Sequence, residues 1–441
     1  MAWYDSAIFY HMYPLGMVSA EKINEDGPVR HRFPALSAYL PYLRTLGVNA
    51  VYIGPLFESG SHGYDTTDYR RIDRRLGSNA DFRDFVDRAH ALGIRVVVDA
   101  VFNHTGRGFF AFRDIQEKRE MSSYRDWYKG INFAWGSPKG DSFSYSAWRG
   151  AWELPELNFA NGAVRDYLLS TAEFWVREFD IDGLRLDCAD VLDLSFQKDL
   201  RRQTADWKPD FWLMGEVIHG EYARWVNPET LHSVTNYELH KSIYSGFNSH
   251  NFFEIAHNLR RNLQIAGGLY TFLENHDVDR LPDKLENQAH LPLCYLTMFT
   301  LPGHPSLYYG GEFGMRGRKR DGWDDSPMRP PISDPAMAPN AFTDYIAALC
   351  EAYQENPALQ GGEYRELLLR CGQWAYARVQ DGAASILTVL NNEDRAEDIC
   401  ITLPAGGSLC RELLTGETWQ AEDGVLRLQL PGNTGYLIRV E

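Results

Sequence analysis

IRVVVDAVFN, residues 94–103, is the stretch of this 441-residue chain that decides the fold. Its apolar, β-branched residues run without alternation, which is typical of a parallel strand that is buried on both faces. Polar residues stand toward its end: Asp99, Asn103 and, directly after the stretch, His104. A buried strand that ends in such side chains predicts a site at one edge of a parallel sheet.

Seven further runs of this kind lie between residues 6 and 356, separated by longer amphipathic stretches. In ADFRDFVDRAHALG (80–93), the apolar positions from Phe82 to Ala89 fall on one helical face. VRDYLLSTAEFWVREF (164–179) has a similar spacing. The seven runs are SAIFYHMYP (6–14), VNAVYIGP (48–55), DGLRLD (182–187), FWLMGE (211–216), SVTNYE (233–238), GLYTFLENHD (268–277) and SLYYGGE (306–312).

Eight strand–helix units in series predict an α/β fold, a closed (β/α)8 TIM barrel. An open doubly wound sheet is the alternative. It is disfavoured because no glycine-rich phosphate loop follows the first run.

Two regions break the alternation. After the third strand comes an aromatic-rich segment that is too long for a structureless loop, so we expect a small inserted domain at 104–159. The C-terminal region alternates short apolar runs with Gly, Asn and Asp turns, which predicts an antiparallel β-sandwich at 358–441. The barrel then comprises residues 1–103 and 160–357.

Composition excludes several classes of partner. Lys and Arg number 44 against 60 Asp and Glu, a formal charge of −16, which argues against binding to nucleic acid or to an anionic membrane. The N-terminus resembles no secretory signal, and no apolar run is long enough to span a bilayer. The six cysteines are scattered without a CxxC pair, as in a reduced, cytoplasmic protein.

Carboxylates stand at several strand ends, where a barrel gathers side chains at one mouth. Two carboxyl groups that face one bond are what glycoside cleavage requires. Arg185 lies two residues before Asp187 on the same face, and we expect its guanidinium to hold Asp187 ionised as a nucleophile. Glu216, on the next strand, would feel that negative charge and favour its protonated form, as an acid/base needs. Asp277 can then stabilise positive charge at the anomeric carbon.

Four segments resemble, in order, the sequence regions of the α-amylase family of glycoside hydrolases. They are DAVFNH (99–104), GLRLDCAD (183–190), GEV (215–217) and ENHD (274–277), and they are supported by GVNAVYIGP (47–55), LPELN (154–158) and GHPSLYYG (303–310). The resemblance implies barrel domain A, inserted domain B and C-terminal domain C. It also implies a retaining double displacement through a covalent glycosyl-Asp187, with Glu216 as acid/base and Asp277 as third carboxylate.

LPELN and HGYDTTDY most resemble the neopullulanase, cyclomaltodextrinase and maltogenic amylase group. Members of that group usually carry an additional N-terminal domain, whereas this chain begins directly at the first strand. The resemblance implies an α-1,4-glucan or maltooligosaccharide substrate. Transglycosylase activity, or α-glucosidase activity with α-1,6 cleavage, remains the alternative, and isomerase or phosphorylase chemistry occurs on the same scaffold.

Further site residues follow from the resemblance alone. Arg185 matches the family arginine, and His104 and His276 match histidines that bind hydroxyls of the sugar at the cleaved side. Tyr64 matches the aromatic residue that stacks under that sugar. The structural alternatives are a strand-end cap for His104, a buried polar network for His276 and a purely structural role for Tyr64.

Other strand-end residues have expected roles of their own. Asp325 and Arg329 resemble a pair that binds sugars further from the cut. We expect Asp99 to hold Arg185, and Glu238 and Glu312 to be hydrogen-bonding residues of the barrel rim.

No metal ion or other cofactor is expected to be required. Many α-amylases have Lys and His just beyond the nucleophile region, and the histidine backbone binds a structural calcium ion. Here these positions are Asp190 and Val191, and the insertion lacks an evident cluster of oxygen ligands. A backbone carbonyl at this position can still bind calcium, so a structural calcium ion remains the alternative.

Two other classes of function can be weighed on the same residues. A non-catalytic barrel relative would have lost one of the three carboxylates, and none is lost. A carbohydrate-binding module predicts stacking aromatic residues without paired acids at strand ends. The sequence leaves linkage preference, chain length and oligomeric state open.

Overall fold

The computed structural model describes residues 2–25, 27–321, 324–404 and 407–441. Eight parallel strands form one sheet in the order β8-β7-β6-β5-β2-β1-β10-β9. Thr235, directly after β8, pairs in parallel with Tyr270 at the start of β9 and so joins the two edge strands. The sheet is therefore closed, and the predicted barrel is confirmed. The strands are β1 (Phe9–Met12), β2 (Ala50–Ile53), β5 (Arg95–Ala100), β6 (Gly183–Leu186), β7 (Trp212–Gly215), β8 (Ser233–Val234), β9 (Tyr270–Phe272) and β10 (His304–Tyr308).

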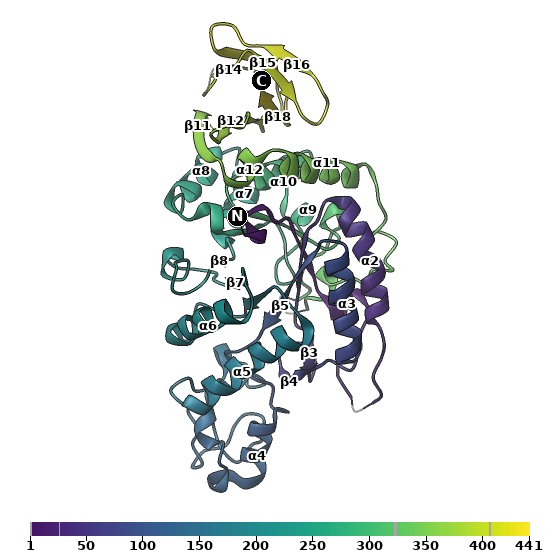
Figure 1. Ribbon diagram of the computed structural model, residues 1–441, viewed down its shortest axis with the longest axis vertical. Coiled ribbons are helices and arrows are strands. Elements are labelled where there is room, and N and C mark those ends of the chain that lie inside the picture. Colours follow the sequence, from purple (N-terminus) through teal and green to yellow (C-terminus); the bar gives the residue numbers. More distant parts are fainter. Residues whose placement is uncertain (1, 26, 322–323, 405–406) are drawn as a thin grey trace.

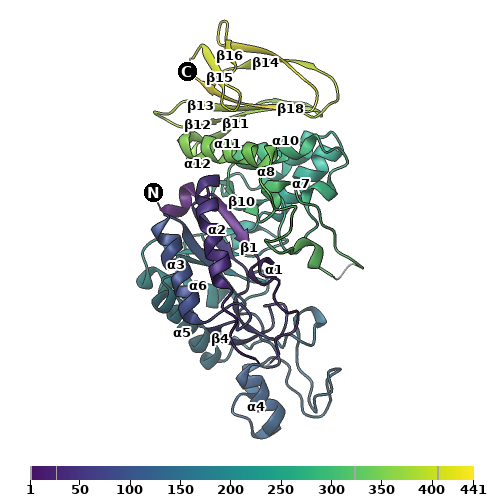
Figure 2. The same ribbon diagram turned by 90° about the vertical axis from the view of Figure 1, so that its right-hand side faces the viewer.

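Helices surround the barrel, as Figures 1 and 2 show. The segment between β7 and β8 differs from the other connections, because its helical part is a 3-10 turn at Tyr222–Arg224. Two consecutive helices, α7 and α8, follow β8 instead. The main helices are α2 (Phe33–Leu46), α3 (Asn79–Ala91), α5 (Gly162–Phe179), α6 (Leu194–Trp207), α7 (Tyr237–Asn248), α8 (Phe252–Arg261), α10 (His290–Thr300) and α11 (Ala341–Glu355), with the short α1 (Pro14–Met17), α9 (Leu281–Lys284) and α12 (Pro357–Gly361).

Helix α3 illustrates how local sequence sets an element. The Ser78 hydroxyl accepts a hydrogen bond from the amide of Asp81, and the Asp81 carboxylate accepts one from the amide of Ser78, which forms a capping box. Gly93, at φ 72°, follows the C-terminal end. The buried residues of the helix are Phe82, Phe85, Val86 and Ala89, the face that the sequence predicts.

The inserted segment after β5 lies at one end of the molecule in Figure 1, with α4 (Phe110–Lys118) as its helix. Phe112, Phe143 and Tyr145 are buried together with Tyr128, so much of the aromatic content of the insertion is its own core. Isolated bridges such as His104–Glu156 tie the two ends of the segment together. The segment also contains the 3-10 turns η2 (Arg119–Met121), η3 (Arg125–Trp127) and η4 (Trp148–Gly150).

An antiparallel hairpin, β3 (Phe57–Ser59) with β4 (Thr66–Ile72), adds to the barrel after β2. The sequence prediction did not include it. Tyr69 of β4 donates to the carbonyl groups of Val101 and His104, so the hairpin supports the end of β5.

The C-terminal region forms antiparallel sheets, as predicted, and it lies at the opposite end of the molecule from the insertion (Figures 1 and 2). One sheet has the order β11-β12-β13-β18-β15-β16 and the other pairs β14 with β17, and a separate apolar core lies among them. The boundaries of the three predicted domains remain predictions. The strands are β11 (Glu363–Leu369), β12 (Gln373–Val379), β13 (Ser385–Asn391), β14 (Glu397–Thr402), β15 (Leu409–Glu412), β16 (Thr418–Gln420), β17 (Val425–Leu430) and β18 (Thr434–Val440).

Across the described residues, the helices are too short or too polar to cross a lipid bilayer. All six cysteines are free thiols, and Cys188, Cys294, Cys350 and Cys410 are buried.

Candidate active site

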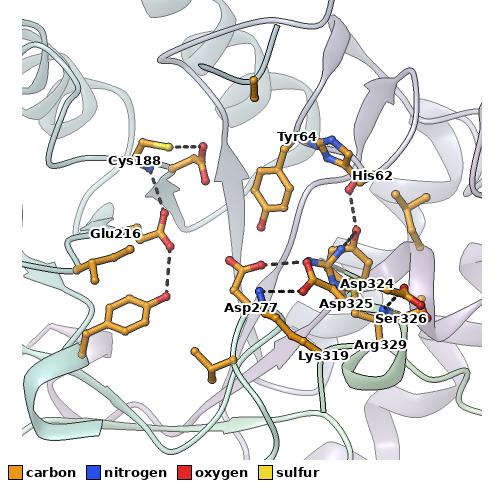
Figure 3. Close-up of a pocket in the computed structure, with 18 of the residues that line it drawn as sticks. His62, Tyr64, Cys188, Glu216, Asp277, Lys319, Asp324, Asp325, Ser326 and Arg329 are labelled. Carbon is orange, nitrogen blue, oxygen red and sulfur yellow. Dashed lines mark hydrogen bonds and ion pairs between the residues drawn. The ribbon is translucent and has the colours of Figure 1, made fainter. Parts of the chain in front are cut away.

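A cavity of about 1460 Å³ opens where the barrel strands end. Seven of the nine predicted site residues line it: Tyr64, His104, Asp187, Glu216, Asp277, Asp325 and Arg329. Arg185 and His276 are nearly fully buried and contact the carboxylates of the cavity. In Figure 3, Glu216 and Cys188 stand on one side of the cavity and Asp277 and Arg329 on the other.

Arg185 is the centre of the carboxylate cluster. Its Nη1 lies 2.9 Å from Asp99 Oδ1 and 2.7 Å from Asp187 Oδ1, and its Nη2 lies 2.9 Å from Glu216 Oε2. The contact with Asp187, expected from spacing on the strand, is present, and so is the separately expected contact with Asp99. The contact with Glu216 was not expected, and it brings the two candidate reacting carboxylates onto one guanidinium.

Arg185 lowers the pKa of Asp187, as expected, but burial outweighs this effect. Burial raises the pKa of Asp187, the negative charges of Glu216 and Asp99 raise it further, and the guanidinium only partly opposes them. The physical reason is that one cation is divided among three buried carboxylates. Asp187 therefore retains a proton more readily than the carboxylate of an isolated Asp–Arg pair would.

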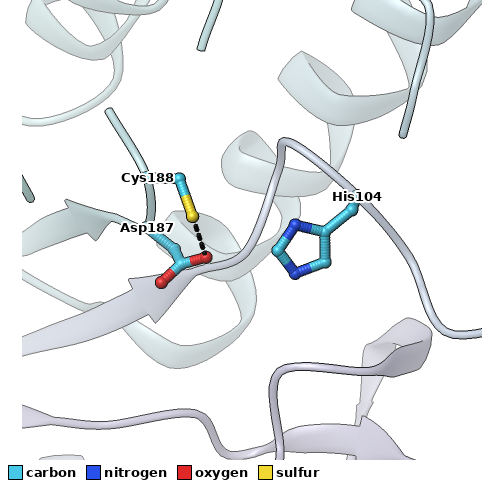
Figure 4. Close-up of side chains that lie close together, drawn as sticks. All are labelled: His104, Asp187 and Cys188. Carbon is cyan, nitrogen blue, oxygen red and sulfur yellow. Dashed lines mark hydrogen bonds between the residues drawn. The ribbon is translucent and has the colours of Figure 1, made fainter. Parts of the chain in front are cut away.

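Cys188 contacts both reacting carboxylates: Figure 3 shows the contact with Glu216, and Figure 4 shows the one with Asp187. Its thiol donates to Asp187 Oδ2 at 3.0 Å, and its backbone amide donates to Glu216 Oε2 at 3.2 Å. Burial and the neighbouring carboxylates raise the pKa of Cys188, so the sulfur stays protonated and acts as a donor. This residue follows the nucleophile in GLRLDCAD, but the sequence alone did not mark it as part of the site.

The surroundings of Asp277 favour its ionised form. His276 Nε2 lies 3.1 Å from its Oδ2, and Arg329 Nη2 lies 3.0 Å from its Oδ1. His276, Arg329 and Arg185 together outweigh the effect of burial and hold the pKa of Asp277 well below its usual range. A carboxylate that stays charged suits stabilisation of a positive transition state.

Tyr64 and His276 form one stacked pair. Their rings are 5.5 Å apart at an angle of 12°, and the Tyr64 hydroxyl contacts both His276 Nε2 and Asp99. Tyr13 stacks on His276 as well, at 5.6 Å. His276 thus lies in a buried polar network, while Tyr64 is half-buried and faces the cavity.

His104 faces the nucleophile from the start of the inserted segment, as Figure 4 shows. Burial lowers its pKa to about 3, so the imidazole is neutral. Its Nε2 is buried and has no hydrogen-bond partner among the described residues. A neutral ring nitrogen beside Asp187 can bind a sugar hydroxyl.

The Asp325–Arg329 pair lies closer to the catalytic centre than the resemblance suggests. Arg329 Nη2 bonds Asp325 Oδ2 at 2.9 Å and also bonds Asp277, while Nη1 lies 3.2 Å from the Tyr13 hydroxyl. Asp325 additionally pairs with Lys319 at 2.9 Å. Loop length hid this contact, because sequence spacing does not say where a long loop folds back.

One group of side chains in the described part of the chain could hold a metal ion: His104, Asp187 and Cys188 (Figure 4). Its imidazole and thiol do not suit calcium, which takes oxygen ligands. Elsewhere, Asp141 of the insertion already binds Arg107 at 2.6 Å, together with Gln116. Asp190 lines the cavity and lies 4.0 Å from Arg149.

Two acidic residues differ from their expected positions at strand ends. Glu238 lies in the first turn of α7, because β8 ends at Val234 and the Asn236 side chain caps the helix. Glu238 lines the cavity and accepts from Asn262 at 3.2 Å.

Glu312 lies in the 3-10 turn η7 (Gly311–Phe313) and is fully buried. Its Oε1 accepts hydrogen bonds from Tyr10 at 2.6 Å and Tyr39 at 3.2 Å. Burial raises the pKa of Glu312 to about 7.

Comparison with known proteins places these observations in a family. Residues 35–341 match the family described as "Alpha amylase, catalytic domain". Neopullulanase 2 of Thermoactinomyces vulgaris is 32% identical over 99% of this chain and 78% of its own. An intracellular maltogenic amylase of Bacillus subtilis (strain 168) is 35% identical over 63% of this chain and 48% of its own. The crystal structure of Ttha1563 from Thermus thermophilus superposes with a TM-score of 0.87 at 29% identity, covering 100% of both chains.

Proposed function

The chain belongs to the α-amylase family of glycoside hydrolases, and from this premise we propose that it cleaves α-1,4 bonds of maltooligosaccharides in the strand-end cavity. It is a retaining hydrolase, since the family acts through a covalent glycosyl–enzyme intermediate. One observation carries the assignment of the reacting residues. The Arg185 guanidinium binds Asp187 and Glu216 together, which supports the short carboxyl separation, about 5 Å, of retaining enzymes.

In the proposed first step, an Asp187 oxygen attacks the anomeric carbon while Glu216 gives its proton to the departing glycosidic oxygen. The carbon–oxygen bond breaks, and the sugar becomes an ester of Asp187. In the second step Glu216 takes a proton from water, the water oxygen attacks the anomeric carbon, and Asp187 leaves as a carboxylate. Asp277 faces the positive charge in both transition states.

Two hydrogen-bond donors to Asp187 support this division of roles. Before attack, the mechanism requires Asp187 to be ionised and Glu216 to carry a proton. The Cys188 thiol supports the ionised form of Asp187 by donating to Oδ2, and Arg185 does so by donating to Oδ1.

The proposed substrate class rests on the aromatic rings that line the cavity and on the names of the relatives. Tyr64 and Trp148 present rings to the cavity, which suits stacking of glucose units. Transglycosylation and α-1,6 cleavage use the same carboxylates and remain the alternative. Analysis of the products from maltotriose and pullulan separates them.

We further propose that the reaction needs no metal ion, because each described step is assigned to a side chain and the donor set beside the nucleophile does not suit calcium. We also propose a cytoplasmic location. The free thiols support it, as does the relative that is named intracellular.

A mechanism-based trap tests the central assignment. A 5-fluoro-α-glucosyl fluoride should leave a glycosyl ester on the peptide that contains Asp187, identified by mass spectrometry. Labelling of Glu216 or Asp277 instead would contradict the proposed roles.

A further inference from the structure

Tyr237 contacts the candidate acid/base from the first residue of α7. Its hydroxyl lies 3.3 Å from Glu216 Oε1. The other carboxyl oxygen, Oε2, already accepts from Arg185 Nη2 at 2.9 Å and from the Cys188 amide at 3.2 Å. A carboxyl oxygen with two strong donors does not also carry the acidic proton, so Oε1 is the oxygen that must give and take it. Tyr237 therefore contacts the oxygen that does the proton transfer.

The direction of the Tyr237 hydrogen bond follows from Asn275. The Oδ1 atom of Asn275 accepts from the backbone amides of Asp277 at 2.8 Å and Val278 at 3.1 Å. Its Nδ2 must then point the other way, and it donates to the Tyr237 hydroxyl at 2.9 Å. Because the tyrosine oxygen is accepting from Asn275, its own hydrogen is left to donate to Glu216.

The tyrosine ring is held in place independently of these hydrogen bonds. It packs edge-on against Phe272 of β9 with ring centroids 4.9 Å apart, and the Asn236 cap holds the start of α7. A phenylalanine at this position would keep the ring packing and lose only the hydroxyl.

We propose that Tyr237 is a positioning residue for the acid/base, oriented by Asn275, and that it stabilises the carboxylate that Glu216 becomes after it gives up its proton. The inference rests on the proposed role of Glu216. Donation to Oε1 favours the ionised carboxyl and holds the group toward the leaving oxygen. The same asparagine binds the backbone of Asp277, so the two carboxylates on opposite sides of the cavity share one support.

The test compares Tyr237→Phe with Tyr345→Phe. Tyr345 donates a hydrogen bond to the carbonyl of Pro292 at 3.0 Å, and neither residue lines the cavity, so its variant controls for the loss of a hydroxyl. For Tyr237→Phe we expect kcat on maltotriose to fall about 10- to 100-fold, within the range of general-acid effects, with KM within about twofold. An activated aryl α-maltoside should lose less, since its leaving group needs less protonation.

The pH profile gives a readout that a structural role would not move. Without the donor to the ionised carboxylate, the acid should keep its proton to higher pH. The basic limb of kcat/KM should therefore move upward by about half a unit to one unit in Tyr237→Phe. It should stay in place in Tyr345→Phe.

A double variant separates failure of this inference from failure of the proposed function. In a Glu216→Gln background, Tyr237→Phe should have little further effect, because its action passes through Glu216. If Glu216→Gln itself lowers both substrates equally, the proposed acid/base role fails. If Glu216→Gln discriminates between the substrates but Tyr237→Phe leaves the basic limb unmoved, or adds its full loss in that background, the inference about Tyr237 is overturned.

Discussion

Arg329 lies 3.0 Å from Asp277, Nη2 to Oδ1, so the candidate third carboxylate is paired with a cation from the loop after β10. The guanidinium also rests 4.5 Å above the centre of the Tyr13 ring. A residue that resembles a binder of remote sugars is thus also a direct partner of the reaction centre.

We predict that Arg329→Gln lowers kcat on the shortest aryl α-maltoside roughly 10- to 100-fold, because the charge environment of Asp277 changes. The pKa of Asp277 is depressed in the native site, and loss of the cation lets it rise toward its ordinary value. Asp325→Asn keeps the Arg329–Asp277 pair and is the control. A loss in Arg329→Gln that appears only as a higher KM for maltohexaose would assign Arg329 to remote sugars instead.

Asp187→Asn should abolish turnover without unfolding the protein. Asparagine is nearly isosteric but cannot form the glycosyl ester, so kcat should fall by about four orders of magnitude or more. The substitution also removes one of three carboxylates that share Arg185, so we expect an unchanged or higher melting temperature. Activity above a few per cent, in a preparation shown by mass spectrometry to be free of deamidated protein, would refute the nucleophile assignment.

Glu312 should make stability depend on pH. Burial raises its pKa from the ordinary value of 4.5 to about 7, so the folded state binds a proton that the unfolded chain releases. The stabilisation is complete below pH 4.5 and is lost as pH rises through 7, a change of about 3 kcal/mol in unfolding free energy. Glu312→Gln should therefore gain melting temperature over the wild type between pH 5 and pH 8. Parallel curves for the two proteins across that range would disprove it.

Removal of metal ions should leave the enzyme unchanged. After extensive dialysis against EDTA, activity and melting temperature should match those of the untreated protein, because the acidic side chains near the site are already engaged by protein donors. A fall of several degrees in melting temperature that added calcium reverses would reveal a structural calcium site.

Short maltooligosaccharides should be preferred to starch. Aromatic rings that line one cavity can bind a few glucose units by stacking. We therefore expect kcat/KM for maltotriose to maltohexaose to exceed kcat/KM for soluble starch, with both expressed per substrate chain end. A clear preference for polymeric starch would refute this substrate assignment and leave that of the carboxylates intact.

Local sequence alone determined the barrel and most of its candidate reacting residues. The run IRVVVDAVFN forms β5, and the face of α3 follows its apolar spacing, because burial of uninterrupted or helically spaced apolar residues has few solutions. Parallel strands present their carboxyl ends at one mouth, so the sequence by itself predicts that Asp187, Glu216 and Asp277 lie together.

Only the tertiary structure decided which residues far apart in the chain contact one another. Spacing placed Arg185 beside Asp187. Only the packing of β6 against β7 shows that the same guanidinium also binds Glu216. Because the cation is shared in this way, burial outweighs its effect on the pKa of Asp187. The path of the loop after β10 brings Arg329 to Asp277, and the early end of β8 places Tyr237 on α7 against Glu216. Sequence patterns report which face of an element is buried, whereas the charge state of a site depends on distances between elements that no local pattern encodes.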